Sequence, residues 1–223
     1  MNRYLQPTRF LDFDTPAVRA FAQQHAGTGS SREKAVRLNL AVRDGIRYDP
    51  YSFRLEPARY AASNCLAAGS GFCVPKAILL AAAARAVGIP AKLGYADVRN
   101  HLTSPRLAEL MRSDVFRWHG YTALFVDGRW LKATPAFDAG LCVRFGVKPL
   151  EFDGTADSVF HAFDVSGRRH MEYLREIGEF DDFPYEPFAA DMREHYAHLL
   201  SEIEARDRRT AAALDTDFAP RAD

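Results

Sequence analysis

A helix with almost no polar face is the feature that most limits how this chain can fold. The run Ala77–Val87 consists of Ala, Leu, Ile and Val apart from one arginine. It follows the turn Gly69-Ser70-Gly71 and stops at Gly88, after which Ile89-Pro90 ends it firmly. A helix that is apolar all round is stable only when other elements cover it. We therefore expect this helix to be buried on most of its sides.

Cys73 lies at, or directly before, the N-terminus of this helix, because Pro75 is well suited to a first helical turn. Unpaired N–H groups and the positive end of the helix dipole favour a thiolate at that position. The thiolate is the nucleophilic form of cysteine. The alternative is that Cys73 is a small apolar residue that packs a turn, as buried free cysteines commonly do. This segment alone leaves both possibilities open.

The composition limits the setting more than the chemistry. The 223 residues are 48% hydrophobic, which suffices for one large domain, and 29 Lys and Arg balance 29 Asp and Glu. This balance offers no general attraction for nucleic acid or an anionic membrane. No initial apolar stretch resembles a signal peptide, and the longest Ala/Leu run is too short to span a bilayer. With three cysteines, we expect a cytoplasmic protein that binds neither membranes nor nucleic acid.

The remaining pattern mixes helices and strands. Expected helices cover 15–27, 30–44, 104–111 and about 188–214, an expected strand covers 91–98, and the region after 138 is expected to be loop-rich. No linker rich in Pro, Ser or Gly divides the chain. We predict a domain over 1–187 and a helical C-terminal extension over 188–223. The role of that extension and the oligomeric state stay open.

The clearest hairpin pairs 119–126 with 129–134 around Asp127-Gly128. With a two-residue turn, His119 is expected to pair with Ala136 and Tyr121 with Thr134, and the side chains at 119, 121, 134, 136 and 138 then share one face. Thr134 and Asp138 are then diagonal neighbours of His119, and either could orient its imidazole. Pro135 cannot donate a hydrogen bond, so the ladder should break there. His119 by itself could equally be a strand histidine satisfied by a neighbour.

Two blocks in this order resemble the transglutaminase-like superfamily. The first block runs from Gly69 to Cys73 and through the helix to Gly88-Ile89-Pro90-Ala91-Lys92, and the second comprises Trp118-His119-Gly120-Tyr121 and Val126-Asp127-Gly128-Arg129-Trp130. Upstream, Ile46-Arg47-Tyr48-Asp49 is similar to the segment that precedes the cysteine helix. The resemblance covers roughly 35–140. It implies an α+β fold of papain-like arrangement, in which a cysteine at a helix N-terminus faces a histidine on an antiparallel sheet.

The resemblance implies that Cys73 is the nucleophile and His119 the base. The family pattern usually has an aspartate where this chain has Thr134, so the third member does not carry over cleanly. We favour Asp138 as the orienting group, with Thr134 second, because a carboxylate stabilises an imidazolium. Phe72, Trp118 and Tyr121 are expected to contact the substrate, although Trp118 and Tyr121 could instead fill the core beneath the substrate groove.

The chemistry that follows from these roles is acyl transfer. The sulfur of Cys73 would attack an amide carbonyl of a peptide or protein, His119 would protonate the leaving amine, and a thioester would form. We favour hydrolysis slightly over transfer to another amine. No calcium loop of the Asp-x-Asp-x-Asp-Gly type is present, and we expect no cofactor. The alternative is a non-catalytic module that keeps the fold and binds a peptide or partner.

The other cysteines and histidines indicate structural roles. Cys65 and Cys142 lack the spacing of a zinc site, so we expect no metal. His195 and His198 are three residues apart on an expected helix and without a third ligand indicate a solvated face. His161 is a weaker candidate for the base, in aromatic surroundings that suit a packed residue.

Overall fold

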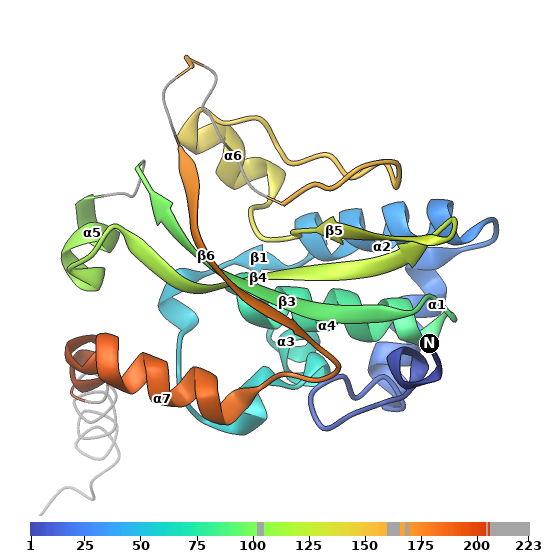
Figure 1. Ribbon diagram of the computed structural model, residues 1–223, viewed down its shortest axis with the longest axis horizontal. Coiled ribbons are helices and arrows are strands. Elements are labelled where there is room, and N and C mark those ends of the chain that lie inside the picture. The colour runs from blue at the N-terminus through green and yellow to red at the C-terminus, as the bar shows by residue number, and fades with distance from the viewer. Residues whose placement is uncertain (102–104, 160–165, 168–169, 204, 206–223) are drawn as a thin grey trace, which may run out of the picture.

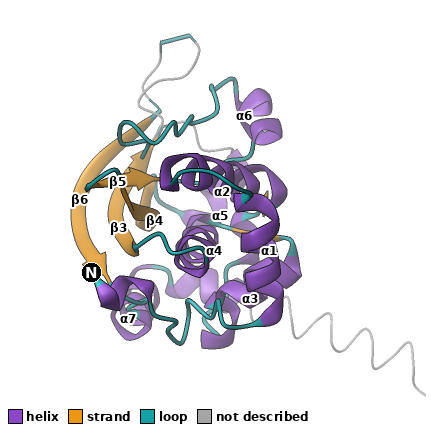
Figure 2. Cartoon of the chain, turned by 90° about the vertical axis from the view of Figure 1, so that its right-hand side faces the viewer, coloured by secondary structure: helices purple, strands orange, loops and turns teal. Residues whose placement is uncertain are grey.

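The structure is a computed structural model that describes residues 1–101, 105–159, 166–167, 170–203 and 205. A four-stranded antiparallel sheet in the order β5-β4-β3-β6 carries helices α1 to α4 on one side (Figures 1 and 2). The strands are β3 (Ala91–Asn100), β4 (Val115–Val126), β5 (Arg129–Ala133) and β6 (Met171–Phe180). The helices are α1 (Pro16–Ala26), α2 (Ser31–Gly45), α3 (Ala62–Ala68), α4 (Cys73–Ala86), α5 (Pro105–Met111), α6 (Ala139–Phe145) and α7 (Tyr185–His195). The expected α+β class is confirmed.

Shorter elements lead into the central helix. Two-residue strands β1 (Arg47–Tyr48) and β2 (Ser70–Gly71) pair in parallel, with Tyr48 opposite Gly71. Three 3₁₀ turns lie in the first part of the chain, η1 (Asn2–Leu5), η2 (Pro50–Ser52) and η3 (Pro57–Tyr60). Since β2 ends two residues before Cys73, the β1–β2 pair holds the residues of the 46–52 segment beside the start of α4.

Helix α4 is buried along almost its whole length, as its apolar sequence predicts. Its two charged side chains are satisfied by backbone carbonyls. The Lys76 ammonium donates to two carbonyls at the C-terminal end of α2. These are the carbonyls of Arg43, at 2.9 Å, and of Ile46, at 2.5 Å. The Arg85 guanidinium donates to the carbonyl of Ala91, at 2.8 Å from one nitrogen. These contacts fasten α4 to α2 and to the start of β3, so α4 is held rigidly.

The local signals for α2 and the hairpin are confirmed. Ser30 and Glu33 form a reciprocal capping box at the start of α2, and the predicted stripe of Ala35, Leu38 and Val42 is buried. Asp127 and Gly128 form the two-residue turn, with φ of 49° and 82°. Positive φ at both positions is the requirement of a type I′ hairpin turn.

The β4–β5 ladder ends at the pair Thr122 and Ala133. The Thr134 N–H then donates to the carbonyl of Ser158 at 2.9 Å. The predicted pairing of residues 119 and 121 with 136 and 134 is therefore wrong. Pro135 is the physical reason, because a residue without an N–H cannot continue the ladder.

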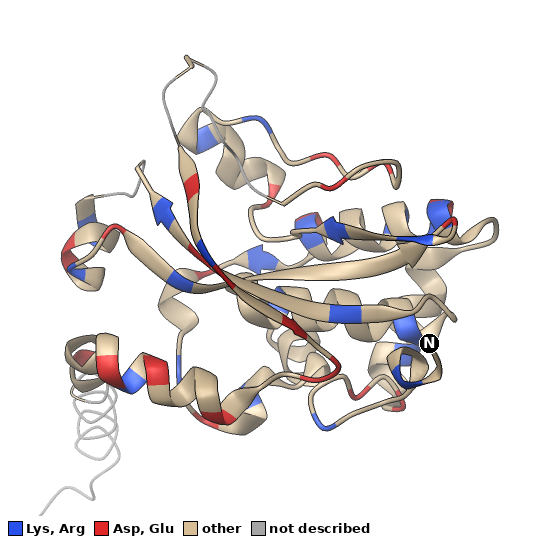
Figure 3. Cartoon of the chain, viewed as in Figure 1, with Lys and Arg blue, Asp and Glu red and all other residues tan. Residues whose placement is uncertain are grey.

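The expectation of a loop-rich region after 138 is wrong in two places. The region contains α6, and it contains β6, which forms an edge of the sheet beside β3. Strand β6 escapes a pattern search because it is mostly polar and partly exposed. Glu176 forms an ion pair with Lys132 on β5, and Glu179 forms one with Lys92 on β3. Figure 3 shows both signs of charge along these strands.

The C-terminal helical region begins earlier than expected and is not continuous. Helix α7 starts at Tyr185, and Tyr196 interrupts the helical backbone before 197–203. Phe188 on α7 is 1% exposed and packs its ring against Tyr60, Phe183 and Trp118. The apolar face of α7 thus belongs to the core, whereas the division into a domain of 1–187 and an extension stays a prediction. Within the described ranges, no helix combines the length and apolar character needed to span a lipid bilayer.

Candidate active site

Cys73 is the first residue of α4. Phe72 precedes it in extended conformation and makes no side-chain cap, so the helix begins without a carboxylate or hydroxyl over its first N–H groups. The sulfur instead lies against backbone N–H groups, including those of Val74 and of Gly120 on β4. Cys73 is 9% exposed. The structure thus confirms the predicted position of Cys73 at a helix N-terminus.

The protonation state differs from the expectation. Burial raises the pKa of the Cys73 thiol to about 11, against the opposing effect of the N–H groups that face the sulfur. The backbone N–H groups at the helix terminus lower the pKa, as expected, but the loss of hydration outweighs them. A nucleophilic Cys73 therefore requires a base that removes the thiol proton.

Gly120 brings β4 against the start of α4. A Cβ on Gly120 would lie 3.1 Å from Cα of Val74 and 3.2 Å from the carbonyl oxygen of Cys73. These distances are shorter than ordinary carbon contacts, so a side chain at this position would require the neighbouring backbone to shift by a few tenths of an ångström. Since His119 directly precedes Gly120, this crossing brings the backbone of the predicted base next to the residue that carries the predicted nucleophile.

The backbone before His119 is irregular. His119 pairs with Ala96 on β3, whereas the next pair joins Phe116 to Val98, so β4 has an extra residue at this point. Trp118 lies in this bulge with a φ of +58°, a conformation that is uncommon for a bulky residue. Bulges of this kind change the direction of the following side chain. The bulge therefore sets the direction of the His119 side chain, which is 4% exposed.

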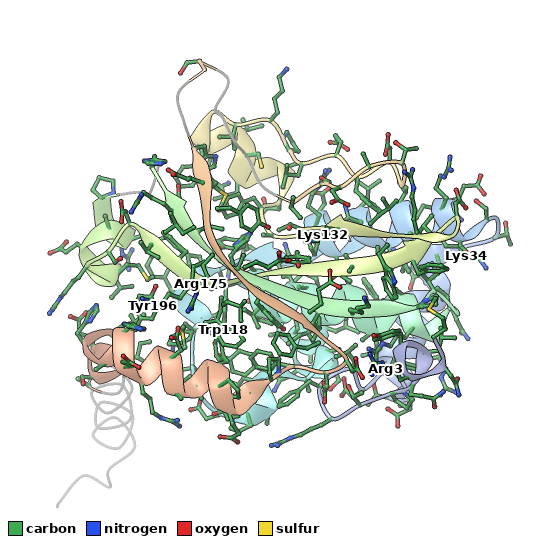
Figure 4. All side chains as sticks on the ribbon, in the orientation of Figure 1. Arg3, Lys34, Trp118, Lys132, Arg175 and Tyr196 are labelled. Carbon is green, nitrogen blue, oxygen red and sulfur yellow. The ribbon has the colours of Figure 1, made fainter. Side chains whose placement is uncertain are left out.

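A buried carboxylate holds this bulge. Asp97 on β3 is 5% exposed and accepts the Trp118 N–H at 3.2 Å. It also forms ion pairs with Arg175 on β6, at 2.9 Å, and with Arg117, at 3.4 Å. The Trp118 indole N–H donates to Asp191 on α7 at 3.1 Å, and Figure 4 shows Trp118 and Arg175 on the side of the sheet near α7. Asp97 therefore connects three strands at the residue before the predicted base.

The two candidates for the third member lie in different surroundings. Thr134 and His119 line one narrow space, together with Phe137, and Asp138 does not line it. The Thr134 hydroxyl is buried and has no hydrogen-bond partner in the described part of the chain. The Asp138 carboxylate accepts the Leu141 N–H at 2.8 Å, as the cap of α6, and the Tyr48 N–H at 3.2 Å. Both Asp138 oxygens are thus used by backbone groups, which disfavours our first choice for the orienting group.

A cavity of about 210 Å³ opens beside His119. Its wall is mostly apolar and comes from the 47–51 segment, the ends of β3 and β4, α5, α6 and the start of β6. The lining residues are Arg47, Tyr48, Asp49, Pro50, Tyr51, Asn100, Leu107, Phe116, His119, Phe137, Leu141, Cys142, Phe145, Val147, His170 and Met171. A concave, mainly aromatic site with a few polar groups is the usual form of a ligand pocket.

The three residues predicted to contact substrate do not line this cavity. The Trp118 ring packs against Tyr95 and Phe188 in the core. Tyr121 is fully buried, and its hydroxyl donates to Glu176 at 3.1 Å. Phe72 packs edge to face on Phe53 and Tyr60. These aromatic side chains fill the core or cover the sheet. The prediction failed because a position in a strand or turn does not by itself reveal which side chains face the cavity.

Tyr48 is the site residue that the motif search missed. It lines the cavity, and its ring meets Phe137 edge to face with centroids 4.8 Å apart. Burial and the nearby Cys73 raise the pKa of Tyr48 well above its ordinary value, so its hydroxyl remains a donor. The signal was present, since the segment from Ile46 to Asp49 resembles the family, but only the pairing of Tyr48 with Gly71 brings it beside the α4 N-terminus.

The described cysteines and histidines assemble no metal site. None of the three cysteines forms a disulfide bond, and the described residues contain no group of three His, Cys, Asp or Glu that could hold a metal ion. His195 pairs with Asp191 at 3.5 Å, and the His198 ring lies 3.2 Å from the Leu110 carbonyl oxygen. His161 lies outside the described residues.

A cysteine at a helix N-terminus, packed on a strand that carries a histidine beside an aromatic cavity, is the arrangement of papain-like folds. The model of the transglutaminase-like superfamily matches residues 19–135, more than half of the chain. The protein therefore belongs to the transglutaminase-like superfamily, and the resemblance stated from its motifs is confirmed.

One solved structure supports this fold at a TM-score of 0.50, and a second resembles the chain more weakly. The chain is similar to a "Putative Cysteine Protease" from Cytophaga hutchinsonii, at 16% identity and a TM-score of 0.50, over 80% of this chain and 46% of that one. A "putative protease" from Parabacteroides distasonis matches at 17% identity and a TM-score of 0.39, over 59% of this chain and 24% of that one. The chain thus spans less than half the length of these proteins. Among curated proteins, no match was found.

Proposed function

We propose that this protein is a cysteine-nucleophile acyl-transfer enzyme that acts on amide bonds of peptides or proteins, with hydrolysis favoured over transfer to an amine. The observation that carries the proposal is the crossing at Gly120, where the strand of His119 lies against the first turn of α4 and Cys73. Family membership supports it, because the sequence blocks around Cys73 and His119 resemble the cysteine and histidine blocks of that family.

The raised pKa of Cys73 favours general-base catalysis over a resting ion pair. His119 removes the thiol proton while the sulfur attacks the amide carbonyl carbon. The resulting oxyanion is stabilised by the Cys73 N–H at the helix N-terminus, and Tyr48 is the candidate for a second donor. His119 then gives the proton to the leaving amine nitrogen, the carbon–nitrogen bond breaks, and a thioester remains.

Water completes the cycle by hydrolysing the thioester. His119 takes a proton from the water, the hydroxide oxygen bonds to the acyl carbon, and the sulfur leaves and is reprotonated. We assign the orienting role to Thr134 in preference to Asp138, because Thr134 shares the narrow space around His119, whereas backbone N–H groups occupy both Asp138 oxygens. The Thr134 hydroxyl makes no hydrogen bond within the described residues, so its bond to His119 would form only in the substrate complex. A hydroxyl orients an imidazole without stabilising its charged form, which suits general-base catalysis by His119.

The alternative is a non-catalytic module that binds a peptide or partner in the same cavity. The small exposure of Cys73 and the threonine at the family's aspartate position favour this alternative. The two functions differ in the reactivity of the thiol, since a binding module has no need of a base next to Cys73.

The test is alkylation of Cys73 by iodoacetamide between pH 6 and 10, followed by peptide mass spectrometry, in wild type and His119→Ala. Cys142 is the matched control, because burial raises its pKa to about 11 as well. We expect faster labelling of Cys73 than of Cys142 near neutral pH, and a loss of at least about a hundredfold in His119→Ala, the lower end of the range for general-base assistance. Equal rates for both cysteines, unchanged by the substitution, would leave the binding module as the function.

A further inference from the structure

We infer that the cavity beside His119 binds a large apolar side chain, aromatic or branched aliphatic, on the acyl side of the amide that Cys73 attacks. The inference rests on the proposed function and names its substrate class. Neither family membership nor the similar structures assigns a side chain to this position.

The size of the cavity suits one such side chain. Its volume is about 210 Å³. An apolar cavity of about 150 Å³ is enough to hold a benzene molecule. The cavity therefore has room for the ring of phenylalanine or for a leucine or methionine side chain, with little space left over. A glycine or alanine substrate would leave most of it unfilled.

The chemistry of the wall favours an apolar side chain over a charged one. Phe116, Phe137, Leu141 and Met171 present carbon to the interior from four separate segments. The charged lining residues, Arg47 and Asp49, form an ion pair with each other at 3.2 Å. A charged substrate group would lose its hydration and meet mostly carbon surface, and burying a charge in this way costs free energy. Carbon surface is what this wall can bind.

The position of the cavity connects it to the reacting bond. Tyr48 and His119, the two wall residues with proposed chemical roles, flank the α4 N-terminus where the thioester would form. The acyl group is the part of the substrate that stays on Cys73 after the amine has left. A side chain of that acyl group held against Tyr48 would fix the carbonyl oxygen near the two proposed oxyanion donors.

Helix α6 supplies both a specificity variant and its control. Leu141 lines the cavity, whereas Val143 on the same helix is 78% exposed and does not. Leu141→Trp would fill the cavity, and Val143→Trp would add the same side chain at a solvent-facing position. Comparing the two variants separates occlusion of the cavity from a general effect of tryptophan on α6.

The experiment measures second-order labelling rates of Cys73 by N-acetyl-phenylalanyl and N-acetyl-alanyl chloromethyl ketones, with iodoacetamide in parallel. Each ketone alkylates the sulfur with loss of chloride and carries the side chain on the acyl side. We expect a phenylalanyl to alanyl ratio of at least about 10, as for burial of an aromatic ring. The ratio should fall toward 1 in Leu141→Trp and stay unchanged in Val143→Trp.

A ratio near 1 in the wild type, an equal fall in both variants, or failure of both ketones to label Cys73 would overturn the inference. So would a preference for glutamyl or lysyl ketones over the phenylalanyl one. The iodoacetamide arm reports on the proposed function separately. Cys73 labelling that is slow and independent of His119 refutes catalysis, whereas rapid His119-dependent labelling without an apolar preference refutes only the side-chain specificity.

Discussion

The contact between β4 and α4 can be tested by giving Gly120 a side chain. In Gly120→Ala the new methyl group would lie 3.1 Å from Cα of Val74 and 3.2 Å from the Cys73 carbonyl oxygen, and both are backbone atoms. Carbon atoms pack at about 3.5–4.0 Å, so α4 must withdraw by several tenths of an ångström. Overpacking of this kind costs about 1–3 kcal/mol of unfolding free energy. The same displacement moves Cys73 relative to His119, so His119-dependent labelling should fall about tenfold.

The assay is urea unfolding of wild type, Gly120→Ala and the control Gly45→Ala, with iodoacetamide labelling of Cys73 in each. Gly45 ends α2, and a Cβ there would meet nothing within 4 Å. The control should therefore gain about 0.5–1 kcal/mol, the normal benefit of replacing a helical glycine. If Gly120→Ala is stabilised as much as Gly45→Ala and labels at the wild-type rate, the close approach of β4 to α4 is not what aligns the site.

Three other perturbations test separate parts of the structure. Thr134→Val removes a buried hydroxyl that has no partner in the described part of the chain, so the free energy of unfolding in urea should rise by about 1 kcal/mol. His119-dependent labelling of Cys73 should fall in the same variant, and a loss of stability would contradict the prediction. Asp97→Ala, which frees the Trp118 N–H and removes the ion pairs of Asp97 with Arg117 and Arg175, should cost about 2–3 kcal/mol and slow the same labelling, whereas Asp97→Asn keeps an acceptor and should cost less. Burial lowers the pKa of Lys76 from 10.5 to about 8, so the folded state releases this proton above pH 8 while the unfolded chain keeps it up to about 10.5. The unfolding free energy of wild type minus that of Lys76→Met should therefore rise between pH 7 and 10, by up to about 3 kcal/mol, and a flat difference would refute it.

The local elements were predictable because each depends on a few adjacent residues. The capping box of Ser30 and Glu33, the type I′ turn at Asp127-Gly128 and the stops at Gly88 and Pro90 act over one turn of chain. Hydrophobic patterning identified α4 as a buried helix for the same reason. Strand β6 was missed because it is an edge strand whose side chains are only partly buried and include several charged residues, so no period-two pattern marks it.

The site was predictable only in part. Motif order identified Cys73 and His119 as the residues to examine, and both lie at the α4–β4 crossing. The orienting group depended on where the chain goes after Ala133, and Pro135 diverts it toward Ser158. This diversion leaves Thr134 beside His119 and commits Asp138 to backbone N–H groups of α6 and β1.

The sequence by itself determined the family, the central helix, the hairpin and the two residues with the clearest chemical roles, because these depend on residue type and short-range order. The tertiary structure decided the protonation state of Cys73, since burial outweighs the helix terminus and no sequence pattern measures burial. It also decided which aromatic side chains face the cavity. Phe116 and Phe137 line it, while Trp118 and Tyr121 do not, because a bulge and the end of a ladder change which way each strand residue points.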